Sequence, residues 1–77
     1  MDEKVFLLRV GSNIKKFRKK MGLTQSDLAA EYKDEFISKQ TISKMENGKR
    51  NLTLTTILKL ANALEVAPKD LLDVTKD

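Results

Sequence analysis

The sequence lacks both cysteine and histidine. Without cysteine the chain has no disulfide framework, no thiolate nucleophile and no cysteine-ligated metal. Without histidine it also lacks the commonest general base and the commonest zinc ligand. Two adjacent carboxylate pairs remain, Asp2–Glu3 and Asp34–Glu35, but the side chains of neighbouring residues diverge, which is typical of solvated surface. We therefore expect a protein that is not an enzyme and that uses no metal or cofactor.

Long apolar runs, glycine and proline are scarce as well. The longest apolar runs fall far short of a transmembrane span, and Met1–Asp2–Glu3 does not open a signal peptide, so we place the protein inside a cell. Its 77 residues hold three glycines, one proline, no repeat and no linker. This length and punctuation predict a single domain over residues 1–77 with one small core.

Acidic residues are missing from two basic stretches. Residues 9–20 contain six basic residues and no acidic one, and residues 39–50 contain four basic residues against Glu46 alone. The acidic residues collect elsewhere, within a net charge of +4. This asymmetry favours a polyanionic partner. A membrane surface fits less well, because no long amphipathic helix has a large apolar face free to insert.

A helical period runs through nearly every segment, so the sequence predicts an all-α domain with five helices. We expect them over about residues 3–21, 25–32, 39–47, 54–64 and 68–73. Gly22 ends the first helix, Thr24, Ser38 and Thr53 cap the next three, and Pro68 occupies the first position of the fifth. The predicted apolar faces are Phe6, Val10, Ile14, Phe17 and Met21; Leu28 and Ala29; Ile42 and Met45; and Leu54, Ile57, Leu58, Ala61 and Leu64.

The third helix has a polar stripe opposite its apolar face. Gln40, Ser43, Lys44 and Asn47 follow the spacing i, i+3, i+4 and i+7, so they share one side of the helix. None of them is negatively charged. In a DNA major groove, Gln pairs with adenine, Lys reaches guanine acceptors and Ser serves either base. A solvated helix face has similar chemistry, so the stripe alone does not separate the two interpretations.

Taken together, the motifs resemble the phage-repressor and Cro-like (XRE-type) helix-turn-helix family over about residues 10–72. GLTQxxLA at residues 22–29 and ISxxTISxxENG at residues 37–48 form the most specific part of the match. Outside them, the resemblance rests on Val10–Gly11, Ile14, Phe17–Arg18, Leu54, Thr56, Lys59–Leu60–Ala61 and Ala63–Leu64. The string RNLTL at residues 50–54 resembles controller proteins of restriction–modification systems. The resemblance implies a compact, lambda-repressor-like five-helix domain whose second and third helices form the motif.

The resemblance also implies roles for individual residues. Base-reading positions are Lys39, Gln40, Ser43 and Lys44. DNA-backbone positions are Lys19, Thr24, Gln25, Asn47, Lys49, Arg50 and Asn51, and Gln25 would also brace the start of the recognition helix. For the lysines of the first helix, including Lys19, a solvated face that suits the helix dipole is the alternative to phosphate contact. Arg18 and Glu46 match a family ion pair, which is structural.

The resemblance implies a sequence-specific transcriptional regulator that is cytoplasmic and associated with the nucleoid of a prokaryote or with phage DNA. Because one module presents a small reading face, we expect a homodimer on a two-fold-related operator. The candidate interface consists of Val66, Leu71, Leu72 and Val74, for which core packing is the alternative. An antitoxin-type module that binds a toxin partner and autoregulates is the alternative function.

Two departures from the family concern the connection between the second and third helices. The usual glycine in the turn is missing, and the stretch from Ala29 to Ile42 is three residues longer than is typical. Either the second helix extends by a turn, or residues 31–36 form part of a longer loop pinned by Phe36 and Ile37. The sequence leaves both alternatives open.

Overall fold

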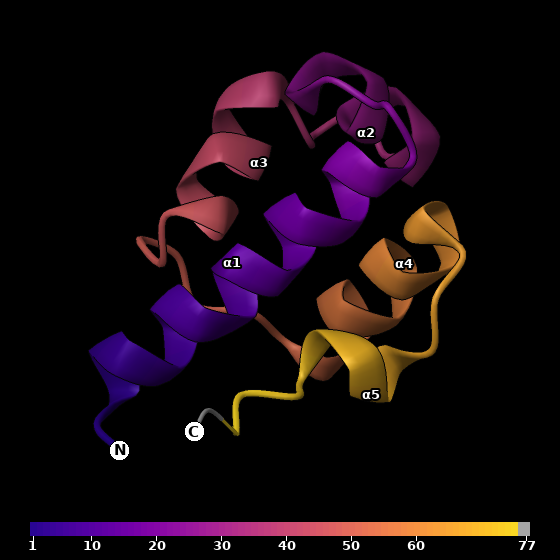
Figure 1. Ribbon diagram of the computed structural model, residues 1–77. Coiled ribbons are helices and arrows are strands. Elements are labelled where there is room, and N and C mark those ends of the chain that lie inside the picture. Colours follow the sequence, from indigo (N-terminus) through magenta and orange to yellow (C-terminus); the bar gives the residue numbers. More distant parts are fainter. Residues whose placement is uncertain (76–77) are drawn as a thin grey trace.

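The computed structural model describes residues 1–75, and these residues form five helices and no strand. The helices are α1 (Glu3–Lys20), α2 (Gln25–Tyr32), α3 (Lys39–Glu46), α4 (Leu54–Leu64) and α5 (Pro68–Leu71). The long helix α1 runs through the middle of the molecule, with α3 along one side and with α4 and α5 on the other (Figure 1). The predicted all-α, five-helix fold is therefore confirmed.

Short-range hydrogen bonds fix where the helices begin. The Thr24 hydroxyl accepts from the Asp27 N–H at 3.0 Å, and the Asp27 carboxylate accepts from the Thr24 N–H at 2.9 Å. Ser38 and Thr53 cap α3 and α4 in the same way, with the backbone N–H three residues on as the donor. Each cap satisfies an amide that lacks a partner within its helix. The starts of α2, α3 and α4 agree with the sequence-based prediction.

The hydrophobic core is built around α1 and takes side chains from all five helices. Its members are Val10, Ile14, Leu28, Tyr32, Ile42, Met45, Ile57, Leu60, Ala61, Leu64 and Leu71. The predicted face of α4 is partly wrong, because Leu54 and Leu58 are 82% and 49% exposed whereas Leu60 is fully buried. The buried face of α4 is centred on Ile57, Leu60, Ala61 and Leu64, and Leu54 and Leu58 lie at the edge of that arc. The ends of the predicted α1 face, Phe6 and Met21, are also partly exposed.

The connection between α2 and α3 is a loop, which settles the alternative that the sequence left open. Lys33 ends α2 in the left-handed conformation (φ 61°), where a glycine is the usual choice. A turn follows, in which the Ile37 N–H donates to the Asp34 carbonyl and the Phe36 N–H donates to the Asp34 carboxylate. Ile37 packs against the core, but Phe36 is 83% exposed. The expectation that Phe36 pins this loop is wrong, because the turn directs its side chain outward.

Helix α1 also holds the segment that follows α5. The buried Asn13 amide donates to the carbonyls of Leu71 and Asp73, at 3.0 and 2.8 Å, and Arg9 donates to the Val74 carbonyl at 3.0 Å. With these carbonyls taken by α1, α5 ends at Leu71, two residues earlier than predicted. Leu71 has no exposed surface. Its proposed place in a dimer interface is therefore wrong, because its side chain belongs to the core.

Candidate nucleic-acid interface

Helix α3 divides into a buried and an exposed side, as its polar stripe predicts. Ile42 and Met45 are buried against the core. Lys39, Gln40 and Lys44 are exposed on the other side. In the part of the chain that the structure describes, neither lysine is paired with a carboxylate. Their ammonium groups are therefore available to a ligand.

Two polar residues of the same stripe are already engaged with each other. The Asn47 amide donates to the Ser43 carbonyl at 2.9 Å and approaches the Ser43 hydroxyl at 3.4 Å. The same carbonyl also accepts from the Asn47 backbone N–H at 3.1 Å, so Asn47 closes the last turn of α3 with both groups. Ser43 is half-buried, so its hydroxyl is less accessible than the side chains of Gln40 and Lys44.

A buried charge cluster anchors the end of α3. Arg18 Nε and Nη2 donate to the two carboxylate oxygens of Glu46, at 2.6 and 3.1 Å, and Arg18 Nη1 donates to the Leu23 carbonyl at 2.8 Å. Both side chains are at least nine-tenths buried. The two parallel bonds fix the orientation of Glu46 as well as its position. The pair that the family resemblance implies is thus formed, and it ties α3 to α1.

Gln25 joins this cluster from the first residue of α2. Its Nε2 donates to Glu46 Oε1 at 3.1 Å. The expectation that Gln25 braces the start of the recognition helix is therefore wrong in its detail, because Glu46 is the last residue of α3. Gln25 is half-buried, and the start of α2 is linked through it to the end of α3.

Two glycines allow α1 and the end of α3 to approach closely. A methyl group at Gly11 would overlap the carbonyl of Met45 and the backbone of Glu46. Gly48, with φ 68°, turns the chain away from α3, and a methyl group there would lie 2.9 Å from the backbone of Leu8. A glycine within an otherwise unbroken helical pattern is the only signal that the sequence offers for the Gly11 contact.

The buried position of Glu46 has an electrostatic consequence. It is the only acidic residue in residues 39–50, and it is 4% exposed and neutralised by Arg18. The exposed charges of this stretch are therefore all positive: Lys39, Lys44, Lys49 and Arg50. The surface of α3 and the turn after it thus presents a positive potential to its surroundings.

The remaining residues expected at the DNA backbone all lie at the surface. Thr24, Lys19, Lys49, Arg50 and Asn51 are exposed. The Thr24 hydroxyl accepts the α2 capping bond. On α1, the ammonium groups of Lys16 and Lys20 lie over the ring of Phe17, at 4.8 and 5.4 Å from the ring centre. These two have a local aromatic partner, whereas no such contact engages Lys19 in the described residues.

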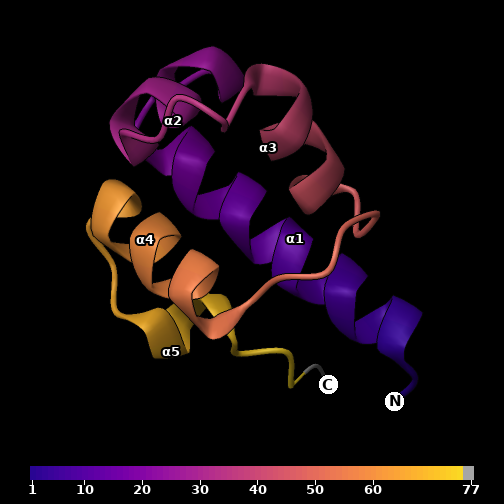
Figure 2. The same ribbon diagram turned by 180° about the vertical axis from the view of Figure 1, so that it is seen from behind.

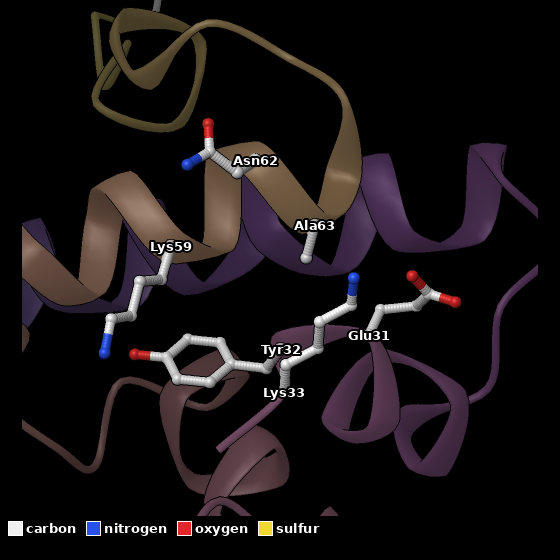
Figure 3. Close-up of a pocket in the computed structure, with 6 residues that line it drawn as sticks. All are labelled: Glu31, Tyr32, Lys33, Lys59, Asn62 and Ala63. Carbon is white, nitrogen blue, oxygen red and sulfur yellow. The ribbon is translucent and has the colours of Figure 1, made fainter.

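A separate groove of about 290 Å³ lies between the end of α2 and α4. Figure 3 shows Lys59 at the hydroxyl end of Tyr32 and Lys33 at the opposite end of the groove, beside Ala63. The Lys59 ammonium lies 5.8 Å from the centre of the Tyr32 ring. Because the two ammonium groups do not converge on one point, this groove lacks the geometry of an anion site. It is a packing boundary between α2 and α4.

Comparison with known proteins identifies this arrangement of α2 and α3. A family model described as helix-turn-helix matches residues 14–71. The chain belongs to the helix-turn-helix family. It is a transcriptional regulator of the XRE type rather than an enzyme, as the sequence predicted. In the described residues, no helix of this regulator is long and apolar enough to cross a membrane.

The relatives of this helix-turn-helix regulator include restriction–modification controllers. It is 38% identical over 68 residues to the uncharacterised HTH-type transcriptional regulator y4dJ of Sinorhizobium fredii, covering 88% of this chain and 84% of that protein. It is 39% identical over 69 residues to the control protein C.BamHI of Bacillus amyloliquefaciens, covering 88% and 82%. The crystal structure of the controller protein C.AhdI from Aeromonas hydrophila superposes with a TM-score of 0.82 at 32% identity, covering 92% and 99%. The predicted resemblance to controller proteins is confirmed.

Proposed function

We propose that this regulator binds a two-fold-related operator as a homodimer and reads bases with Lys39, Gln40, Ser43 and Lys44. The observation that carries the proposal is the exposed side of α3, which offers amide, hydroxyl and ammonium groups without a free carboxylate. Lys39, Gln40 and Lys44 are the principal readers. Ser43 contributes less, because it is half-buried and Asn47 approaches its hydroxyl.

The rigidity of α3 supports this proposal. Base reading requires side chains held on a rigid element, because small displacements lose hydrogen bonds. Here the end of α3 is fixed by Arg18 and Gln25 through Glu46, and by the close approach at Gly11. The start of α3 is fixed by the Ser38 cap and by Ile37, which packs against the core.

The remaining contacts of the proposed complex are with phosphates. Lys49, Arg50 and Asn51 extend the positive surface beyond α3, and Thr24, Gln25 and Lys19 lie at the start of α2 and the end of α1. Backbone N–H groups at the starts of α2 and α3 add donors suited to phosphate oxygens. These contacts fix the register of the protein on the duplex, whereas the α3 stripe supplies the sequence preference.

The size of the molecule is consistent with one half-site for each copy. Helix α3 has eight residues, which is about 12 Å of helix, whereas half-sites one helical turn apart are separated by roughly 34 Å. One α3 therefore reaches one half-site, and a second copy is needed for the other. We propose that the DNA upstream of its own gene contains such an operator.

The experiment is equilibrium binding of the purified protein to its own upstream DNA at several salt concentrations. A scrambled duplex of equal length is the control. The expected result is a preference for the upstream DNA at every salt concentration, with both affinities falling as salt rises because bound phosphates release counterions. Equal affinity for the two duplexes would contradict the proposal.

A further inference from the structure

Helix α4 exposes two leucines that have no role in the core. Leu54 and Leu58 are 82% and 49% exposed. They are four positions apart in the sequence, so they lie one above the other on the same side of the helix. Single exposed leucines are ordinary on a protein surface. Two of them on one side of α4, together with an apolar cleft lined by the segment that leads into this helix, mark a candidate interface.

The cleft lies between the first turns of α1 and the segment that leads into α4. Its volume is about 220 Å³, enough for a leucine side chain, and Phe6, Leu7 and Leu52 provide a mainly apolar lining. Glu3 and Asn51 complete it. Figure 2 shows the segment after α3 crossing α1 and entering α4. Asn51 and Leu52, which line the cleft, belong to this segment and precede the first residue of α4, Leu54.

We propose that the exposed leucines and this cleft are the dimer interface, with Leu54 of each copy seated in the cleft of the other. This proposal rests on the proposed homodimer and names its surface. We take a second copy of the chain to be the occupant of the cleft because one short stretch carries both complementary features. Leu52 lines the cleft, and Leu54, two positions later, projects from the surface. In a two-fold interface, each copy offers the same patch, so both complementary features must lie within that patch.

This surface suits a dimer on DNA better than the residues expected from the sequence. Leu71 is buried, Val66 and Val74 pack against the core, and only Leu72 is appreciably exposed, at 37%. By contrast, the proposed interface adjoins the segment that bears Lys49, Arg50 and Asn51 and leads directly from α3. Pairing at this position would set the separation of the two α3 helices through the short segment that joins α3 to α4.

The first test is sedimentation equilibrium of the Leu54→Ser variant, with Phe36→Ser as the matched control. Both residues are more than four-fifths exposed, so both variants keep the fold, which unchanged thermal unfolding verifies. We expect Leu54→Ser to raise the dimer dissociation constant by about tenfold or more, because two buried leucine contacts are lost for each dimer. Phe36→Ser should leave the dissociation constant unchanged.

DNA binding separates this proposal from the proposed function. With a duplex that contains a single half-site, Leu54→Ser should bind as wild type does, whereas its affinity for a two-site operator should fall. If Leu54→Ser leaves the dimer dissociation constant unchanged, the proposed interface is wrong. It is also wrong if Leu72→Ser, rather than Leu54→Ser, raises that constant strongly. If the protein binds no specific DNA but Leu54→Ser still breaks the dimer, the interface stands and the proposed function fails.

Cross-linking supplies a positive test, because the natural chain contains no cysteine. A tagged Leu54→Cys protein is mixed with an untagged Glu3→Cys protein under mild oxidation. Glu3 lines the cleft, so a disulfide between the two different variants is expected. The matched mixture of Phe36→Cys with Glu3→Cys should not cross-link. Equal cross-linking in both mixtures contradicts the seating of Leu54 in the cleft.

Discussion

Replacing Glu46 with glutamine removes one negative charge from a buried cluster while nearly preserving the shape of the side chain. The wild-type carboxylate accepts from Arg18 Nε, Arg18 Nη2 and Gln25 Nε2. The carboxamide keeps one acceptor oxygen and brings an N–H₂ group toward the donors of Arg18. The guanidinium then remains charged, buried and without its counter-ion.

The expected loss is large because neither partner can recover its interactions with water. Removing one member of a buried ion pair costs roughly 3–5 kcal/mol, and both side chains are at least nine-tenths buried. For a domain of this size, each 1 kcal/mol lowers the Tm by about 4–8 °C. The Glu46→Gln variant should therefore melt at least about 12 °C below wild type.

Urea unfolding with linear extrapolation measures the change in the free energy of unfolding, and thermal unfolding measures the change in Tm. The matched control is the double variant Arg18→Met/Glu46→Leu, which replaces the pair with apolar side chains and should recover most of the lost stability. A loss below about 1 kcal/mol for Glu46→Gln, the value of an exposed pair, would refute the reasoning. So would a double variant no more stable than the single one.

Three further predictions concern the close contact with α1, the phosphate contacts and pH. Gly11→Ala should lower the free energy of unfolding by at least about 1–3 kcal/mol, since its methyl group would overlap the end of α3; unchanged urea midpoints would contradict this. Lys49→Ala should weaken binding to all duplexes alike and reduce the salt slope by about one, and a change confined to the specific duplex would assign Lys49 to base reading. The Thr24 N–H and then the Thr24 hydroxyl hold the pKa of Asp27 below its usual value. Its contribution to stability is therefore complete above the unfolded pKa of about 4 and lost as pH falls through the lower folded value. Asp27→Asn should reduce the dependence of the urea midpoint on pH below about pH 4, whereas parallel curves would exclude this contribution.

The helix starts could be predicted because their causes are local. Thr24, Ser38 and Thr53 each cap a helix by a hydrogen bond to the residue three positions later. The polar stripe of α3 is local in the same sense, since it depends only on the helical period. For such features the identities of neighbouring residues determine the geometry.

The features that sequence reasoning missed depend on residues far apart in the chain. Asn13 bonds to carbonyls 58 and 60 residues away, which ends α5 early. The bond from Gln25 to Glu46 spans 21 residues, so its position at the end of α3 depends on how α2 and α3 pack. Phe36 was misplaced because an aromatic residue favours burial in general, whereas the turn at Asp34 directs this one outward. Tertiary packing decides such positions.

Selection of bound sites from random DNA tests the central claim most directly. We expect enrichment of a two-fold-related pair of half-sites, bound at least about 10³-fold more tightly than random duplex. Repeating the selection with Gln40→Ala should relax the preference at one position of each half-site, at about 1–3 kcal/mol per lost base contact. If wild type enriches no sequence, or if Gln40→Ala selects the same operator with the same ranking of variants, α3 does not read bases in the way proposed.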